Sequence, residues 1–218
     1  MRIAVLGTGV VGRTLAAGLH DLGHDVVMGT RDPASTLARD DEALTRWRAE
    51  HDAVGLLTFA DAASGSDLVV NATSGAATLD VLDQAGEALD GRVLLDVSNP
   101  LDFSRGFPPT LFVADTDSLA EQAQAAHPRA RVVKALNTMT ADLMVRPGLL
   151  PEGTTVFVSG DDPDAKEVVT GLLHSLGHTD VLDLGGLATA RGTEMYLALW
   201  VRAMGALGTP LFNIRVVR

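Results

Sequence analysis

Three closely spaced glycines constrain the fold of this chain more than any other feature. Gly7, Gly9 and Gly12 lie in the segment Val5-Leu6-Gly7-Thr8-Gly9-Val10-Val11-Gly12. An apolar run at 3–6 predicts a buried strand before them, and apolar residues at helical spacing predict a helix after them. In this setting the first glycine makes a tight turn, the second lets the backbone approach a pyrophosphate, and the third lets helix and strand pack closely. The segment predicts dinucleotide binding; the alternative is a tight turn without a ligand.

The rest of the chain alternates between strand and helix patterns. Predicted strands lie at 25–28, 55–59, 67–72, 93–97, 131–136, 155–159 and 179–184. Predicted helices lie at 76–89, 118–126, 164–176 and 191–207, with an extended tail at 211–217. Ser118 and Glu121 form a capping-box pattern at the start of one helix. This order predicts an α/β fold, a Rossmann-type doubly wound parallel sheet with helices on both faces.

A chain of 218 residues is somewhat longer than one typical domain. Hydrophobic residues make up 46%, which is ample for a buried core. A loop rich in Pro and Gly at 146–153 follows the predicted strand at 131–136. We therefore expect a nucleotide-binding domain at 1–140. A small C-terminal α/β appendage at 141–218 would pack on it and help to form a second-substrate site.

Composition excludes several classes of function. Lys and Arg number 17 against 28 Asp and Glu, a formal net charge of −11, and a nucleic-acid surface needs a basic stripe instead. No apolar run approaches the roughly 20 residues that span a bilayer. The chain has no cysteine, and Gly177 separates His174 from His178, so we expect no metal site. We expect a cytoplasmic protein with small-molecule partners.

The end of the second predicted strand indicates which dinucleotide binds. NAD-binding sequences place an acidic residue there for the ribose hydroxyls, whereas this chain has Thr30 and Arg31. A hydroxyl and a guanidinium suit the 2′-phosphate of NADP. Asp32 next to them is an objection, unless it points away as a cap before Pro33. A solvated cation is the alternative interpretation of Arg31.

Polar residues follow three later strands, at the edge where open α/β sheets place ligands. Ala72 and Thr73 follow the strand at 67–72, Ser98 and Asn99 follow the strand at 93–97, and Asn137 and Thr138 follow the strand at 131–136. We expect the first two pairs to contact the cofactor, with ordinary turns as the equal alternative. We expect the third pair to contact the second substrate.

Several segments resemble the family of coenzyme F-420 (F420)-dependent NADP oxidoreductases. The segments are MRIAVLGTGVVGRTLAAGLHDLGHDVVMGTRDP, VFVSGDDPDAKEVVTGLL and VLDLGGLATARGTEMYLALWVRAMGALG. The first is shared widely among Rossmann enzymes, and the other two are more specific. The resemblance covers most of the chain and is weakest at 33–65 and 102–115.

The resemblance implies a two-electron transfer between NADP and a 5-deazaflavin. The pyrophosphate would lie on Thr8, Gly9, Val10 and Val11. Thr30 and Arg31 would hold the 2′-phosphate, and Thr73 and Asn99 would flank the ribose and nicotinamide. The deazaflavin would lie on the nicotinamide, near 137–139 (Asn137, Thr138 and Met139) and the last helix. Some relatives use an ordinary flavin, so FMN or FAD is the alternative acceptor.

Two departures from the family pattern bear on these expectations. Methanogen-type reductases tend to have a lysine soon after the Ser-Arg pair, where this chain has Ala34-Ser35-Thr36. They also tend to have His-Thr where this chain has Asn137-Thr138, near the acceptor ring. The last helix carries an apolar stripe that includes Met204, which we expect at the second-substrate site. Such a stripe is also typical of core packing or of a homodimer contact.

No residue is assigned as a catalytic acid or base, since hydride transfer between two cofactors demands none. Oxidation of an alcohol or hydroxy acid, like reduction of a carbonyl, needs a proton partner for the oxygen, and Lys134 is the one candidate. An NADPH-dependent reductase of an imine or carbonyl is therefore an alternative function. A non-catalytic NADP(H) sensor is an alternative of another class.

Overall fold

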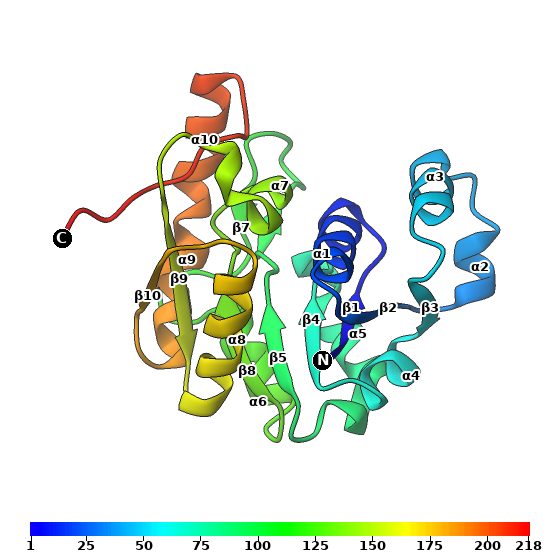
Figure 1. The fold of residues 1–218 in the computed structure, drawn as a ribbon. Coiled ribbons are helices and arrows are strands. Elements are labelled where there is room, and N and C mark those ends of the chain that lie inside the picture. The colour runs from blue at the N-terminus through cyan, green and yellow to red at the C-terminus, as the bar shows by residue number, and fades with distance from the viewer.

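The computed structural model describes residues 1–218, which form one eight-stranded sheet in the order β10-β9-β8-β5-β4-β1-β2-β3 (Figure 1). The strands of this sheet are β1 Arg2–Leu6, β2 Asp25–Thr30, β3 Gly55–Thr58, β4 Leu68–Asn71, β5 Val93–Asp96, β8 Arg131–Ala135, β9 Thr155–Gly160 and β10 Asp180–Asp183. The helices are α1 Val10–Asp21, α2 Pro33–Leu37, α3 Glu42–Glu50, α4 Phe59–Ser64, α5 Thr78–Ala85, α6 Leu119–Ala126, α7 Ala141–Val145, α8 Pro163–Ser175, α9 Ala190–Met195 and α10 Leu197–Leu207. A separate hairpin consists of β6 Leu101–Asp102 and β7 Thr110–Leu111.

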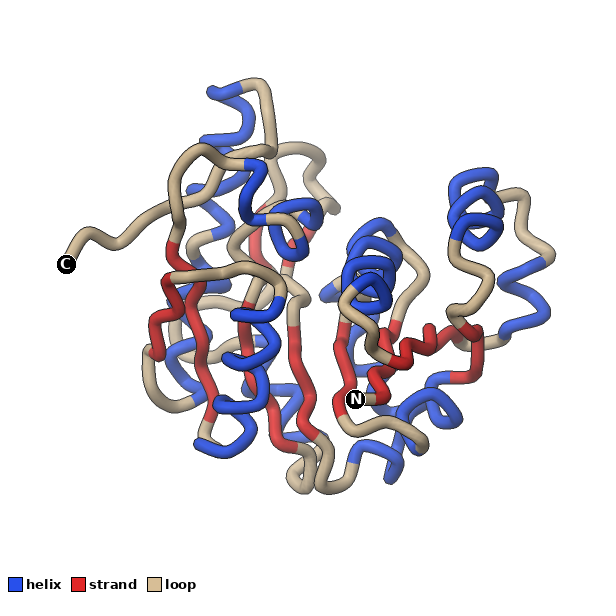
Figure 2. Tube along the Cα trace, in the orientation of Figure 1, coloured by secondary structure: helices blue, strands red, loops and turns tan.

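The sheet separates two apolar cores. One lies under α1, α7 and α8, where Leu15, Leu143 and Val169 are buried against the strands. The other lies under α4, α5, α6 and α9, where Leu82 and Ala120 are buried. Figure 2 shows the strands running between these helices. Both faces of the strands are therefore covered, which confirms the predicted Rossmann-type α/β fold.

The sheet is not parallel throughout. The strands β3, β2, β1, β4, β5 and β8 are parallel to one another, but β9 pairs antiparallel with β8, and β10 pairs parallel with β9. Apolar patterns predict a strand without its direction, which depends on the path of the connection before it. The predicted parallel sheet is found from β3 to β8, and the antiparallel strand β9 belongs to the segment that was predicted as a C-terminal appendage. The strands after 140 extend the main sheet, and the division at 140 remains a prediction.

Polar and short elements differ most from the sequence expectations. Helices α2 and α3 and the β6–β7 hairpin lie where none was predicted. The predicted helix at 191–207 is divided at Tyr196 into α9 and α10. The tail contains no strand, although the Thr155 N–H donates to the Ile214 carbonyl at 3.0 Å. None of the helices has both the length and the apolar character needed to cross a lipid bilayer.

Candidate functional site

The glycine loop joins β1 to α1 and is closed by contacts that only glycine permits. Gly7 has a φ of +112°, and its N–H donates to the Gly29 carbonyl at 2.9 Å. A Cβ on Gly12 would lie 2.1 Å from the Gly7 carbonyl oxygen, so a side chain there would break the turn. A Cβ on Gly9 would meet nothing within 4 Å. Folding therefore requires the glycines at 7 and 12, whereas Gly9 faces open space.

The start of α1 offers backbone donors to an anion. Gly9 is its N-cap, and no side chain caps the first turn. The free N–H groups and the positive end of the helix dipole favour a negatively charged group at this point. The residues fit a pyrophosphate: open space stands at Gly9, where a side chain would otherwise obstruct it. This geometry supports the predicted roles of Thr8, Gly9, Val10 and Val11, which remain predictions.

A cavity of about 400 Å³ lies beside this loop at the carboxyl ends of β4 and β5. Its walls are small or apolar, and none of its lining side chains titrates: Val11, Ala72, Thr73, Ser74, Gly75, Ala76, Val97, Ser98, Asn99, Leu101 and Phe103. The structure thus brings together Ala72, Thr73, Ser98 and Asn99, which the sequence placed on separate loops. A Cβ on Gly75 would lie 2.0 Å from the Asn99 carbonyl oxygen, so these two loops touch.

Buried polar residues hold the cavity walls in place. The Asp96 carboxylate accepts from the Asn71 side-chain amide at 2.8 Å and from the Ser98 hydroxyl at 2.7 Å. The Asn71 amide oxygen accepts from the Thr73 hydroxyl at 2.6 Å. These bonds connect both loops of the cavity to the ends of their strands. Asn71 and Asp96 were not predicted as site residues, although each is the last residue of its strand and is polar.

Lys134, which is buried in β8, also belongs to this hydrogen-bond network. Its ammonium donates to Asp96 at 2.7 Å and to the Ser98 carbonyl at 2.6 Å, and it pairs with Glu194 at 2.8 Å. Burial opposes the charge, but the two carboxylates outweigh it and raise the pKa of Lys134. Lys134 is 1% exposed and does not line the cavity, so its position gives no support to the role of proton partner considered from the sequence. Glu194, which also accepts from the N–H groups of Leu119 and Ala120, had no sequence signal.

Asn99 and Asn137 form a reciprocal amide pair. Asn99 donates to the Asn137 carbonyl, and Asn137 donates to the Asn99 side-chain oxygen, each at 2.9 Å. The preceding residue, Leu136, is buried with a φ of +63°, a left-handed conformation that costs a non-glycine residue about 1–3 kcal/mol. The structure therefore holds Asn137 against the cavity wall at Asn99, and nothing in the sequence signals the strained residue.

Other residues predicted for the second substrate do not line the cavity. Thr138 is 2% exposed, and Met139 is 5% exposed and belongs to the core under α1 and α8. Met204 lies half-buried on α10, which extends beyond the sheet in Figure 1. The roles of Thr138, Met139 and Met204 remain predictions.

The end of β2 has the polar character expected for the 2′-phosphate, but Thr30 and Arg31 are each bonded to another side chain. The Thr30 hydroxyl is buried and bonds to the Thr36 hydroxyl at 2.8 Å, while the exposed Arg31 guanidinium donates to Asp80 at 2.9 Å. Asp32 is the N-cap of α2, where it accepts from the N–H of Ser35 at 3.1 Å. Bonds from Ser35 lower the pKa of Asp32. Asp32 therefore turns toward Ser35, and Arg31 is the exposed cation nearest this strand end in sequence.

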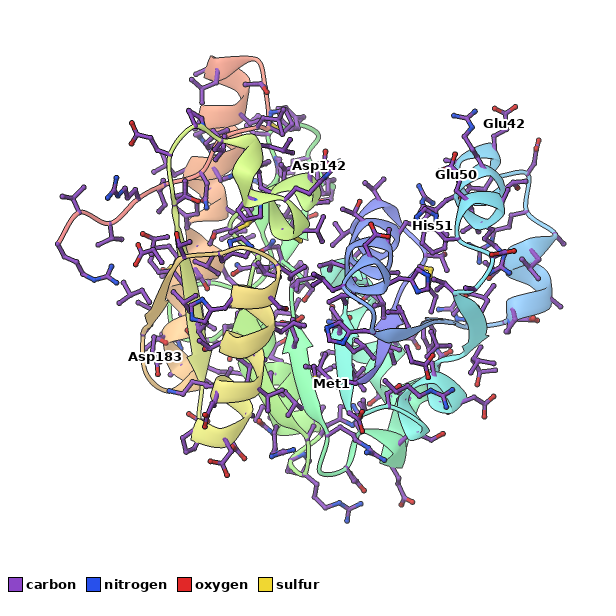
Figure 3. The ribbon with its side chains drawn as sticks, viewed as in Figure 1. Met1, Glu42, Glu50, His51, Asp142 and Asp183 are labelled. Atoms are coloured by element: carbon purple, nitrogen blue, oxygen red, sulfur yellow. The ribbon has the colours of Figure 1, made fainter.

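A larger hollow of about 730 Å³ lies beside α1, but few of the residues predicted to contact the cofactor line it. Figure 3 shows Asp142 on one side of α1 and Glu50 and His51 on the other, and all three line this hollow. Charges of both signs border it, and Val10 is its only residue from the glycine loop. No group of three or more His, Asp or Glu is placed to hold a metal ion. The smaller cavity is therefore the candidate site.

Comparison with known proteins identifies similar chains. A family model described as "NADP oxidoreductase coenzyme F420-dependent" matches residues 2–100. The solved structure of an Arthrobacter sp. FB24 protein, provisionally described as an F420-dependent NADP reductase, is 56% identical, covers 100% of both chains and gives a TM-score of 0.97. The F420-dependent NADP reductase of Methanocaldococcus jannaschii is 29% identical over 206 residues, 92% of this chain and 91% of that enzyme.

A further relative is much longer than this chain. The metalloreductase STEAP3 of Rattus norvegicus is 29% identical over 193 residues, which are 88% of this chain. The chain spans only 36% of that relative's length.

Proposed function

Because the chain belongs to the coenzyme F420-dependent NADP oxidoreductase family, we propose that it transfers a hydride between NADP(H) and the 5-deazaflavin F420. The protein is an NADP-dependent oxidoreductase, and F420 is the acceptor that we propose for it. The supporting observation is the cavity of about 400 Å³, which adjoins the dinucleotide loop and has no titratable side chain in its walls.

That observation favours hydride transfer between two rings over the reduction of a carbonyl or imine. A ring-to-ring transfer needs the two carbon centres face to face and water excluded, whereas carbonyl reduction also needs a proton donor. Bound NADPH supplies the hydride from its nicotinamide ring. The protein then has to position the two rings. The cavity wall of small and amide side chains is suited to that role. With Lys134 held in its ion-pair network, the cavity lining contains no titratable acid that could protonate a carbonyl oxygen.

In this proposal the cofactor extends along the carboxyl edge of the sheet. Its pyrophosphate lies on the loop at 7–12, its 2′-phosphate beside Thr30 and Arg31, and its nicotinamide near Thr73, Ser98 and Asn99. The second ring occupies the rest of the cavity, on the side of Asn137. We propose that residues 141–218, a second structural part, contribute to that side, with Met204 of α10 as a contact of the second substrate.

The proposal is tested by mixing the protein with NADPH and, in separate cuvettes, F420, FMN and FAD. Loss of the visible absorbance of each acceptor measures its reduction. We expect rapid bleaching of F420 and slower or no bleaching of the two flavins. Bleaching of a flavin alone would replace F420 by that flavin as acceptor. No bleaching of any of the three would contradict the proposed transfer.

A further inference from the structure

The β6–β7 hairpin exposes three phenylalanines beside the cavity. Phe103, Phe107 and Phe112 are 58%, 64% and 45% exposed, although the whole chain has only six phenylalanines. Large apolar side chains gathered on one short exposed segment are uncommon in a folded protein and mark binding surfaces. The reaction described above gives these three rings no role.

The hairpin is fixed to the cavity. Leu101 and Phe103 belong to its lining, and β6 packs against the turn Gly75–Ala77 on the opposite wall. The Leu101 N–H donates to the Asn99 carbonyl at 2.8 Å, and the Phe112 N–H donates to the Pro100 carbonyl at 3.0 Å. Phe103 is therefore held at the cavity wall with Asn99, the residue expected at the nicotinamide, and Phe107 and Phe112 follow it along the same hairpin segment.

Charge favours a small anionic ligand over a second copy of the chain. Arg105 lies exposed between Phe103 and Phe107 and forms no ion pair within 4.0 Å. Its nearest charge on the hairpin is Asp102, whose pKa is lowered by bonds from Ser104 and by the charge of Arg105. Each chain carries a net charge of −11, which opposes self-association and repels anions except where a cation such as Arg105 is exposed. F420 and FMN combine a flat conjugated ring with a phosphate, and the hairpin combines flat side chains with an unpaired guanidinium.

We propose that Phe103 and Phe107 bind the flat ring system of the second substrate by stacking, so that the hairpin forms the outer wall of the acceptor site. The identity of that ring as a deazaflavin rests on the proposed function. Aromatic side chains bind conjugated rings in offset-stacked or edge-to-face arrangements. The nicotinamide would lie in the inner part of the cavity, and the hairpin would cover the acceptor ring in the rest of it.

The test measures ring binding separately from turnover. Isothermal titration calorimetry gives the Kd of F420 and, separately, of FMN for the protein loaded with NADP⁺, in which no hydride is available. Phe103→Ala and Phe107→Ala are each expected to weaken ring binding by about two- to tenfold. Phe103→Leu keeps an apolar side chain without a ring and is expected to remain weakened. Leu149→Ala is the matched control, because Leu149 is 51% exposed and lies outside the cavity lining.

The outcomes distinguish the two proposals. Binding of FMN but not F420, weakened by the hairpin variants, would overturn the proposed acceptor and support the hairpin's role. Equal Kd values in wild type and in both alanine variants would overturn the hairpin proposal, as would binding of neither ring by the wild type. Light scattering measures the oligomeric state and so tests whether a second copy of the chain binds to the hairpin instead. A wild-type dimer that Phe103→Ala or Phe107→Ala dissociates without weakening ring binding would make the hairpin a self-association surface, and the proposal would fail.

Discussion

At the scale of single residues, Gly9 and Gly12 separate the requirements of binding from those of folding. Gly9 has a φ of −72°, which any residue can adopt, and open space where a Cβ would stand. We predict that the free energy of unfolding of Gly9→Ala lies within about 0.5 kcal/mol of the wild-type value. The same variant is predicted to bind NADPH about five- to a hundredfold more weakly, because the methyl group occupies the approach of the pyrophosphate.

Gly12→Ala is the matched contrast, because its Cβ would lie 2.1 Å from the Gly7 carbonyl oxygen. We expect Gly12→Ala to lower the midpoint of thermal unfolding relative to wild type. Thermal unfolding and fluorescence titration with NADPH measure both effects. Unchanged NADPH affinity in Gly9→Ala would contradict the placement of the pyrophosphate on this loop.

Arg31 determines the choice between the two dinucleotides in this account. A hydrogen bond to a charged group contributes about 1.5–3 kcal/mol, so Arg31→Ala is predicted to weaken NADPH binding about ten- to a hundredfold. NADH lacks the 2′-phosphate, and its Kd should hardly change. Asp80→Asn removes the carboxylate that Arg31 contacts at 2.9 Å and should not weaken NADPH binding. Equal losses of NADPH and NADH affinity in Arg31→Ala would exclude the assignment.

At the scale of elements, the ion network joins β5, β8 and α9 through one lysine. Lys134→Met leaves the carboxylates of Asp96 and Glu194 buried without their cation, and we predict a loss of about 3–5 kcal/mol in the free energy of unfolding. The only other lysine, Lys166, pairs with the exposed Asp183. Lys166→Met should cost about 1 kcal/mol or less. Urea denaturation compares the two variants, and similar losses would show that the buried network does not stabilise the fold.

The contact between α7 and the turn after α8 makes stability depend on pH through His178. Its Nε2 bonds to the Met144 carbonyl at 2.9 Å, and burial lowers the pKa of the imidazole from 6.5. The unfolded chain takes up a proton below that value while the folded chain stays neutral. The contribution to stability is therefore full above pH 6.5 and is lost as the pH falls toward the folded-state pKa.

The thermal midpoint of the wild type is therefore expected to fall between about pH 7 and pH 5. In His178→Gln, which keeps an amide donor for the Met144 carbonyl, the fall should be shallower. Differential scanning calorimetry at several pH values compares the two slopes. Equal slopes would remove His178 as the cause.

At the scale of the whole molecule, local sequence patterns predicted many of the helices and strands but not which of them contact one another. Strand, turn and cap signals lie within a few residues of one another, so β1, the glycine turn and the Ser118 cap of α6 were predicted correctly. The antiparallel β9 and the Asn99–Asn137 pair depend on contacts between residues far apart along the chain. Helix α3 was not predicted, although Asp41 caps it at the Leu44 N–H.

The central claim is a direct transfer of hydride between two stacked rings at the carboxyl edge of the sheet. The most direct test uses NADPH deuterated at either position of nicotinamide C4, with F420 as acceptor, and mass spectrometry of the reduced product. The account predicts that one of the two labels moves to the deazaflavin and that no carbon-bound hydrogen is taken from D₂O. A product whose new carbon-bound hydrogen came from solvent would contradict it.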